Sequence, residues 1–199
     1  MFLKLNLTKL KLTKIIITLE NNFFSFFKDK YKLTKLSDTN VLEVYAWERL
    51  SGENEEEIVL IYWDDEEKIV SYIKENHDVF KIVIVWSAHI LSSIDLKPWD
   101  VILPNTFLYT ESKDAVFLDY AIWENYDLKK FWLFLSWVCL TGKSENKGNF
   151  EADIIDDKSY KVLFLLKQYE ILEKSVVVKS IDWDDAFIEN SFNVVELVL

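Results

Sequence analysis

The sequence predicts one α/β domain, or an α+β variant of it, with a mixed β-sheet and at least three packed helices. Half of the 199 residues are apolar and 16% are aromatic, which is enough for a sizeable core. The short apolar runs 58–63 and 79–86 are typical of strands buried on both faces, and helical spacing separates them. These observations predict one βαβ unit over 58–86 within a single domain of residues 1–199.

The first 36 residues differ in charge from the rest of the chain. They hold eight lysines against Glu20 and Asp29, a local balance of +6 in a chain whose net charge is −11. Leucine alternates with lysine and other polar residues over 3–12, which predicts strands, and phenylalanines at helical spacing predict a short helix over 22–31. We expect this basic, β-rich segment 1–36 to form either an appendage or an edge of the sheet.

The second half of the chain shows the same two periodicities. An unusually apolar helix is predicted over 127–141, ending before Gly142. An amphipathic helix is predicted from about 156 to 173. The runs SVVVKS at 175–180 and FNVVELVL at 192–199 are predicted to be strands.

Composition excludes several classes of function. With three glycines the chain has no glycine-rich phosphate loop, and its single cysteine, Cys139, belongs to no zinc-binding spacing. The acidic charge opposes nucleic-acid binding, and the longest apolar run is too short to span about 30 Å of hydrocarbon. We therefore expect no cofactor, no metal, no nucleic acid and no membrane, and a cytoplasmic location.

Four polar residues follow the two predicted parallel strands. Asp64 and Asp65 come directly after the first strand, and Ser87 and His89 follow the core of the second. Because the carboxyl ends of parallel strands meet at one edge, where ligands gather, these side chains are candidates for one crevice. They would suit a metal-assisted or histidine-assisted hydrolase.

The same aspartates have a structural interpretation, which is capping of the helix that follows. An acidic residue between a strand and a helix is a natural N-cap, and Glu67 stands at capping-box spacing from Asp64. A second Trp-Asp-Asp run occurs at 183–185, but the sequence gives it no comparable context. We interpret the likeness between the two runs as coincidence.

Acidic residues are densest between 43 and 78, where twelve of them stand against three basic residues. Aromatic side chains among such charges suit protein recognition, although a solvated helix face and loop would have the same composition. The main prediction is an acidic, non-enzymatic module that binds a basic protein, as toxin-neutralising immunity proteins of bacterial competition do. The predicted partner-binding residues are Glu53, Glu55, Glu56, Glu57, Trp63, Asp64, Asp65 and Glu66. A further alternative is a structural protein that self-associates through the apolar helix 127–141.

Overall fold

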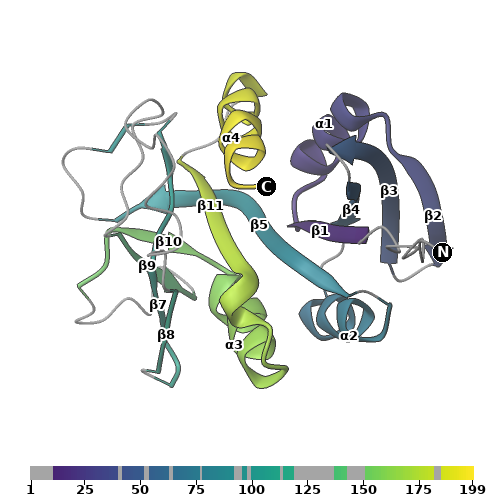
Figure 1. Cartoon of the computed structure of the whole chain (residues 1–199). Helices are drawn as coiled ribbons and strands as arrows, with labels where there is room; N and C mark the ends of the chain where they lie inside the picture. Colours follow the sequence, from purple (N-terminus) through teal and green to yellow (C-terminus); the bar gives the residue numbers. More distant parts are fainter. Residues whose placement is uncertain are drawn as a thin grey trace, which may run out of the picture.

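The computed structural model describes residues 11–39, 42–51, 54–62, 65–76, 78–91, 96–97, 100–112, 114–118, 137–142, 151–181 and 185–199. These residues form a mixed α/β domain (Figure 1). Its strands are β1 (Lys11–Thr18), β2 (Thr34–Thr39), β3 (Leu42–Ser51), β4 (Asn54–Tyr62), β5 (Val79–Ile90), β6 (Val101–Ile102), β7 (Thr106–Tyr109), β8 (Ala115–Phe117), β9 (Val138–Thr141), β10 (Ile154–Asp156) and β11 (Ser175–Ile181). Its helices are α1 (Asn21–Tyr31), α2 (Glu66–Asn76), α3 (Ser159–Gln168) and α4 (Asp185–Val198), with a 3₁₀ turn, η4 (Leu172–Lys174).

The described strands form one sheet in the order β2-β3-β4-β1-β5-β10-β9-β7-β8, and β11 pairs with both β5 and β6. Within it β1 is parallel to both of its neighbours, β4 and β5, and β11 is parallel to β5, so the carboxyl ends of these four strands meet at one edge. The predicted βαβ unit is confirmed as β4, α2 and β5. Its two strands are parallel but not adjacent, because β1 lies between them.

Strand β1 comes from the basic segment 1–36, and it lies inside the sheet. Its residues Ile15, Ile16 and Ile17 are fully buried, as a strand with parallel neighbours on both sides requires. The ammonium of Lys14 lies 2.8 Å from a carboxylate oxygen of Glu56 on β4, and both side chains are almost completely buried. Strand β1 therefore contributes side chains to the core, and Glu56 on the neighbouring strand neutralises the charge of Lys14.

The helices cover both faces of the sheet. In Figure 1, α1 and α4 lie on one side of the central strands and α2 and α3 lie on the other. Helix α1 forms where predicted, because Phe23, Phe27 and Tyr31 recur on the face that packs against the sheet. None of the described helices is both long enough and apolar enough to cross a lipid bilayer.

Two sequence-based predictions of secondary structure are wrong. Residues 138–141 form strand β9 instead of the end of a helix, while most of the predicted helix 127–141 lies outside the described residues. The run 192–199, predicted to be a strand, belongs mostly to α4. Buried residues recur every three or four positions in α4, at Ile188, Ser191, Val195 and Val198. This is a helical period, although the local Val-Val pair is typical of a strand.

Lys81 makes the stability of the fold depend on pH. Burial, together with the nearby charge of Lys14, lowers the pKa of Lys81 from 10.5 to about 8, and its ammonium donates to the carbonyl oxygen of Val198 at 2.7 Å. The unfolded chain keeps this proton to higher pH than the folded chain does, so folding becomes relatively more favourable as pH rises from about 8 towards 10.5. We expect wild type to gain stability relative to K81Q over this interval in urea unfolding experiments. An unchanged difference between about pH 7 and pH 10 would contradict the assignment.

Candidate active site at the carboxyl edge of the sheet

Glu20 occupies the junction between β1 and α1. It is the N-cap residue of α1, yet its side chain makes no capping hydrogen bond. Its backbone N–H donates to Oγ1 of the buried Thr18 at 3.3 Å, which fixes the turn after β1. The carboxylate is therefore held at the positive end of a helix, a favourable place for a negative charge, and is available to another part of the molecule.

That other part is Ser87 on β5. The pairing of β5 with β1 ends at Ile84, whereas β5 continues to Ile90. Beyond the end of β1, the backbone N–H of Ser87 donates to Oε1 of Glu20 at 3.1 Å, and the Ser87 hydroxyl makes a short hydrogen bond to the same oxygen. At His89 and Ile90, β5 pairs with the antiparallel β10. Ser87 thus lies where β5 changes partners, and open α/β sheets bind ligands at such switch points.

The second oxygen of this carboxylate, Oε2, has no hydrogen-bond partner among the described residues although it is buried. On β11, Ser180 pairs in register with Ser87, so the two serines face the same side of the sheet on strands about 5 Å apart. The Ser180 hydroxyl is also buried and lacks a hydrogen-bond partner in the described part of the chain. Because buried polar groups are normally satisfied, Glu20 and Ser180 mark a place for a water molecule or a ligand.

The second Trp-Asp-Asp run follows β11 at this edge. Strand β11 ends at Ile181 and α4 begins at Asp185, while residues 182–184 lie outside the described part. This run therefore joins a buried parallel strand to a helix, a context that was predicted from the sequence for the first run alone. Both runs follow strands of one parallel set, with β1 and β5 between β4 and β11.

Three of the four predicted hydrolase residues, Asp65, Ser87 and His89, lie in the described part of the chain. Asp65 caps α2: it accepts the backbone N–H of Lys68 at 3.2 Å and pairs with the Lys68 ammonium at 3.0 Å. The hydrogen bond with the Lys68 side chain lowers the pKa of Asp65. Ser87 lies in the candidate site with Glu20, and His89 is exposed two residues further along β5. Asp64 lies outside the described residues.

The predicted partner-binding residues have different environments. Glu56 is buried and paired with Lys14, and Glu57 is partly buried and accepts the Thr13 hydroxyl. Glu66 lies in the first turn of α2. Glu53 and Trp63 lie outside the described residues, and Glu55 lies on β4, where the structure describes its backbone. A basic protein partner stays a prediction.

Behind this site lies a buried polar centre built on Asp156 at the end of β10. Its carboxylate lies 2.5 Å from the ammonium of Lys179, which is fully buried and stands 3.9 Å from the centre of the Trp86 ring. Burial by itself raises the pKa of Asp156, but the Lys179 charge and hydrogen bonds from Lys179 and Ser159 outweigh it and lower the pKa. Thr141 and the backbone N–H of Ser159 also donate to the carboxylate. Through these contacts the Asp156 carboxylate connects strands β5, β9, β10 and β11 with the start of α3.

Cys139 is a buried thiol at the edge of that centre, 3.5 Å from Asp156. Burial, and then the charge of Asp156, raise its pKa well above the ordinary value. Because the thiolate is the reactive form, we expect Cys139 to resist 5,5′-dithiobis(2-nitrobenzoic acid) in the folded protein and to react fully in urea. Rapid labelling without denaturant would contradict this environment. Within the described residues, no group of three His, Cys, Asp or Glu side chains converges to hold a metal ion.

Glu20, Ser180 and the pair Asp156–Lys179 were not predicted from the sequence. Glu20 had a readable signal, because it follows the apolar run 15–17 and precedes an amphipathic helix, as Asp64 and Asp65 follow β4. The other three residues had no comparable signal. Asp156 and Lys179 are far apart in the sequence, and only the pairing of strands brings them together.

The fold is similar to that of solved nucleosidase structures. The chain is similar to the 5′-methylthioadenosine/S-adenosylhomocysteine nucleosidase of Colwellia psychrerythraea 34H in complex with adenine, with a TM-score of 0.76 and 13% identity over 96% of this chain and 95% of that one. A futalosine hydrolase mutant of Helicobacter pylori strain 26695 gives a TM-score of 0.74 and 12% identity, covering 94% and 96% of the two chains. The S-adenosylhomocysteine nucleosidase of Streptococcus pyogenes gives 0.74 and 14%, with the same coverage. No protein-family model matches the sequence, and comparison with curated proteins finds no match.

These similarities overturn the main functional prediction. The prediction of an immunity protein that inhibits a toxin is wrong, because almost the whole chain shares its fold with nucleosidases. The predicted alternative, a hydrolase with its site at the carboxyl ends of parallel strands, agrees better with the fold. Asp65 caps α2 and Glu56 lies in a buried ion pair, and composition alone could not distinguish such positions from an exposed surface.

Proposed function

We propose that this protein is a nucleosidase, a hydrolase that cleaves the bond between the sugar and the base of a nucleoside. The observation that carries the proposal is the Glu20–Ser87 pair, whose free carboxylate oxygen Oε2 is buried at the carboxyl edge of the sheet. The substrate class is a purine nucleoside, a choice supported by the names of the neighbouring structures. We also propose that the protein acts in the cytoplasm, where its one cysteine stays reduced.

Hydrolysis of this bond needs a base for the attacking water. In the proposed reaction, Oε2 of Glu20 accepts a proton from water while the water oxygen bonds to the anomeric carbon of the sugar. The two hydrogen bonds from Ser87 hold the other oxygen, which keeps Oε2 in a fixed position. The ionised carboxylate also favours the positive charge that develops on the sugar in the transition state.

The departing base needs a proton as the C–N bond breaks, because the bonding electron pair moves to the base nitrogen. We propose that an aspartate of the junction between β11 and α4 provides it, with Asp182, Asp184 and Asp185 as candidates. Their position in the sequence, directly after the strand beside Ser87, supports this choice. The Ser180 hydroxyl is proposed to bind the sugar or the attacking water.

The test is release of a free base by the purified protein. It is incubated with a panel that includes 5′-methylthioadenosine, S-adenosylhomocysteine, adenosine and inosine, in buffer without phosphate, and the base is separated by chromatography. We expect catalysed release of the base from at least one purine nucleoside, with one sugar formed for each base. If none of the panel is cleaved faster than in buffer alone, the nucleosidase proposal fails.

Ser180 provides a second test of the same site. The S180A variant removes a buried hydroxyl without adding volume, so we expect the fold to be kept and kcat/KM to fall about tenfold, as for loss of one hydrogen bond to a substrate. The matched control is S191A, which removes another buried hydroxyl without a partner among the described residues, on α4. If S180A is as active as wild type, Ser180 is not part of the site.

A further inference from the structure

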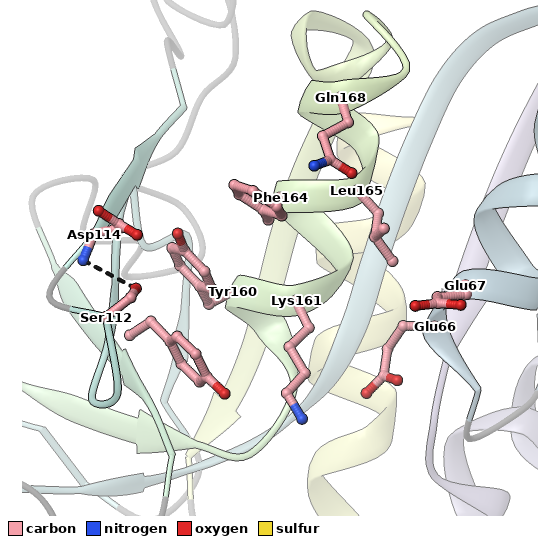
Figure 2. Close-up of a pocket in the computed structure, with 10 residues that line it drawn as sticks. Glu66, Glu67, Ser112, Asp114, Tyr160, Lys161, Phe164, Leu165 and Gln168 are labelled. Atoms are coloured by element: carbon pink, nitrogen blue, oxygen red, sulfur yellow. Dashed lines mark hydrogen bonds between the residues drawn. The ribbon is translucent and has the colours of Figure 1, made fainter.

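A pocket of about 640 Å³ is lined by residues of α2, α3 and the turn between β7 and β8 (Figure 2). Helices α2 and α3 lie on the side of the sheet that is opposite to α1 (Figure 1). Figure 2 shows that the pocket extends along α3, with the turn between β7 and β8 at one side and the start of α2 at the other. Neither Glu20 nor Ser87 lines it. It is therefore separate from the proposed nucleosidase site, and its volume is in the range of small-molecule sites.

Three aromatic rings form one wall of this pocket. Tyr109 and Tyr160 stack with ring centres 5.0 Å apart and planes 5° apart, and Tyr160 stacks on Phe164 at 5.8 Å and 18°. Tyr160 and Phe164 are neighbours because they are one helical turn apart on α3. Tyr160 is buried between the other two rings, whereas Phe164 is 40% exposed. The stack therefore has a fixed interior and offers an apolar aromatic surface to the pocket.

The charged residues that the structure describes around the rings are mainly acidic. Glu66 and Glu67 stand in the first turn of α2, Asp114 follows the turn after β7, and Lys161 is the basic residue among the described residues of the lining. Within that described lining, three carboxylates stand against one ammonium. In Figure 2, Glu66 and Glu67 face α3 across the pocket from Lys161 and Leu165. An aromatic wall with surplus negative charge is complementary to a cation that has an apolar body, because both ring faces and carboxylates attract positive charge.

We propose that this pocket binds a small organic ammonium ion that carries an aromatic or alkyl group. The apolar group packs on Phe164 and Leu165, and the ammonium lies towards Glu66 and Glu67. A neutral ligand of the same shape keeps the apolar contact and loses the attraction of the carboxylates. An anionic ligand is repelled by them. The proposal is independent of the reaction at Glu20.

Calorimetric titration with phenethylammonium chloride tests the proposal on the full-length protein. We expect saturable binding that weakens as salt is raised, and binding of the neutral 2-phenylethanol at least about tenfold weaker. The variant E66Q/E67Q is expected to weaken phenethylammonium about tenfold, and F164A by a similar factor. The controls are E75Q, an exposed acid at the other end of α2, and F117A, an exposed phenylalanine outside the pocket; both should bind as wild type does.

Three results would overturn the proposal. Equal binding of 2-phenylethanol and phenethylammonium would show an apolar surface without selection for charge. Binding that survives both E66Q/E67Q and F164A would place the ligand elsewhere. No binding of phenethylammonium, together with a dimer in sedimentation experiments that F164A dissociates, would assign this face to a second copy of the chain.

Discussion

The E20Q variant is expected to lose about 10²–10⁴-fold in kcat for nucleoside hydrolysis while KM changes little. Glutamine keeps the shape of the side chain and can still accept the N–H of Ser87, but its amide cannot take a proton from water. The loss should therefore appear in the chemical step and leave binding of the nucleoside almost intact. Steady-state kinetics with the best substrate of the panel measures both constants.

The controls separate catalysis from folding. E173Q changes an exposed acid on η4 and should keep wild-type kinetics. S87A, which leaves the carboxylate in place but removes one of its two hydrogen bonds, should lose less activity than E20Q. If E20Q keeps wild-type kcat and unfolds at the same temperature as wild type, Glu20 is not the base.

D156N is expected to lower the free energy of unfolding by about 3–5 kcal/mol, which is the usual cost of removing one partner of a buried ion pair. The substitution leaves Lys179 charged and fully buried, with no carboxylate beside it. K179M should lower the free energy of unfolding by less than D156N does, because Asp156 still accepts hydrogen bonds from Thr141 and Ser159. Urea unfolding at about pH 7 gives both values.

The double variant D156N/K179M shows whether the two residues act as a pair. We expect its cost to be smaller than the sum of the single costs, because neither side chain is left as a lone buried charge. The advantage of wild type over D156N should also shrink as pH falls below 3.8, since the lowered pKa of Asp156 makes its contribution disappear on protonation. Two results would contradict the role of this centre: additive changes in the free energy of unfolding for the two substitutions, or a change below about 1 kcal/mol for D156N.

The sequence predicted the parts of the fold that depend on local pattern. The apolar runs of β4, β5 and β11 and the aromatic stripe of α1 were identified from their periodicity. Prediction from the sequence failed where tertiary contacts determine the secondary structure. Val138 to Thr141 are apolar enough for a buried helix or a buried strand, and pairing with β7 and β10 makes them a strand.

The site was only partly predictable for the same reason. The carboxyl edge and Ser87 followed from the expected parallel strands, but Glu20 required the knowledge that β1 lies beside β5. The lysines before Ile15 indicated an edge strand, and a single buried pair, Lys14–Glu56, lets one of these lysines enter the core. The order of strands, which sets which carboxylate meets which serine, does not follow from periodicity.

The proposed function requires a purine nucleoside to bind beside Glu20 and Ser87. The most direct measurement is a crystal structure of the E20Q variant with 5′-methylthioadenosine, in which slow turnover preserves the substrate. We predict that the sugar lies at the carboxyl edge of β1, β5 and β11, with a water molecule within about 3 Å of both the substituted amide side chain at position 20 and the anomeric carbon. A nucleoside bound only in the α2–α3 pocket, or absent at saturating concentration, would contradict the proposed function.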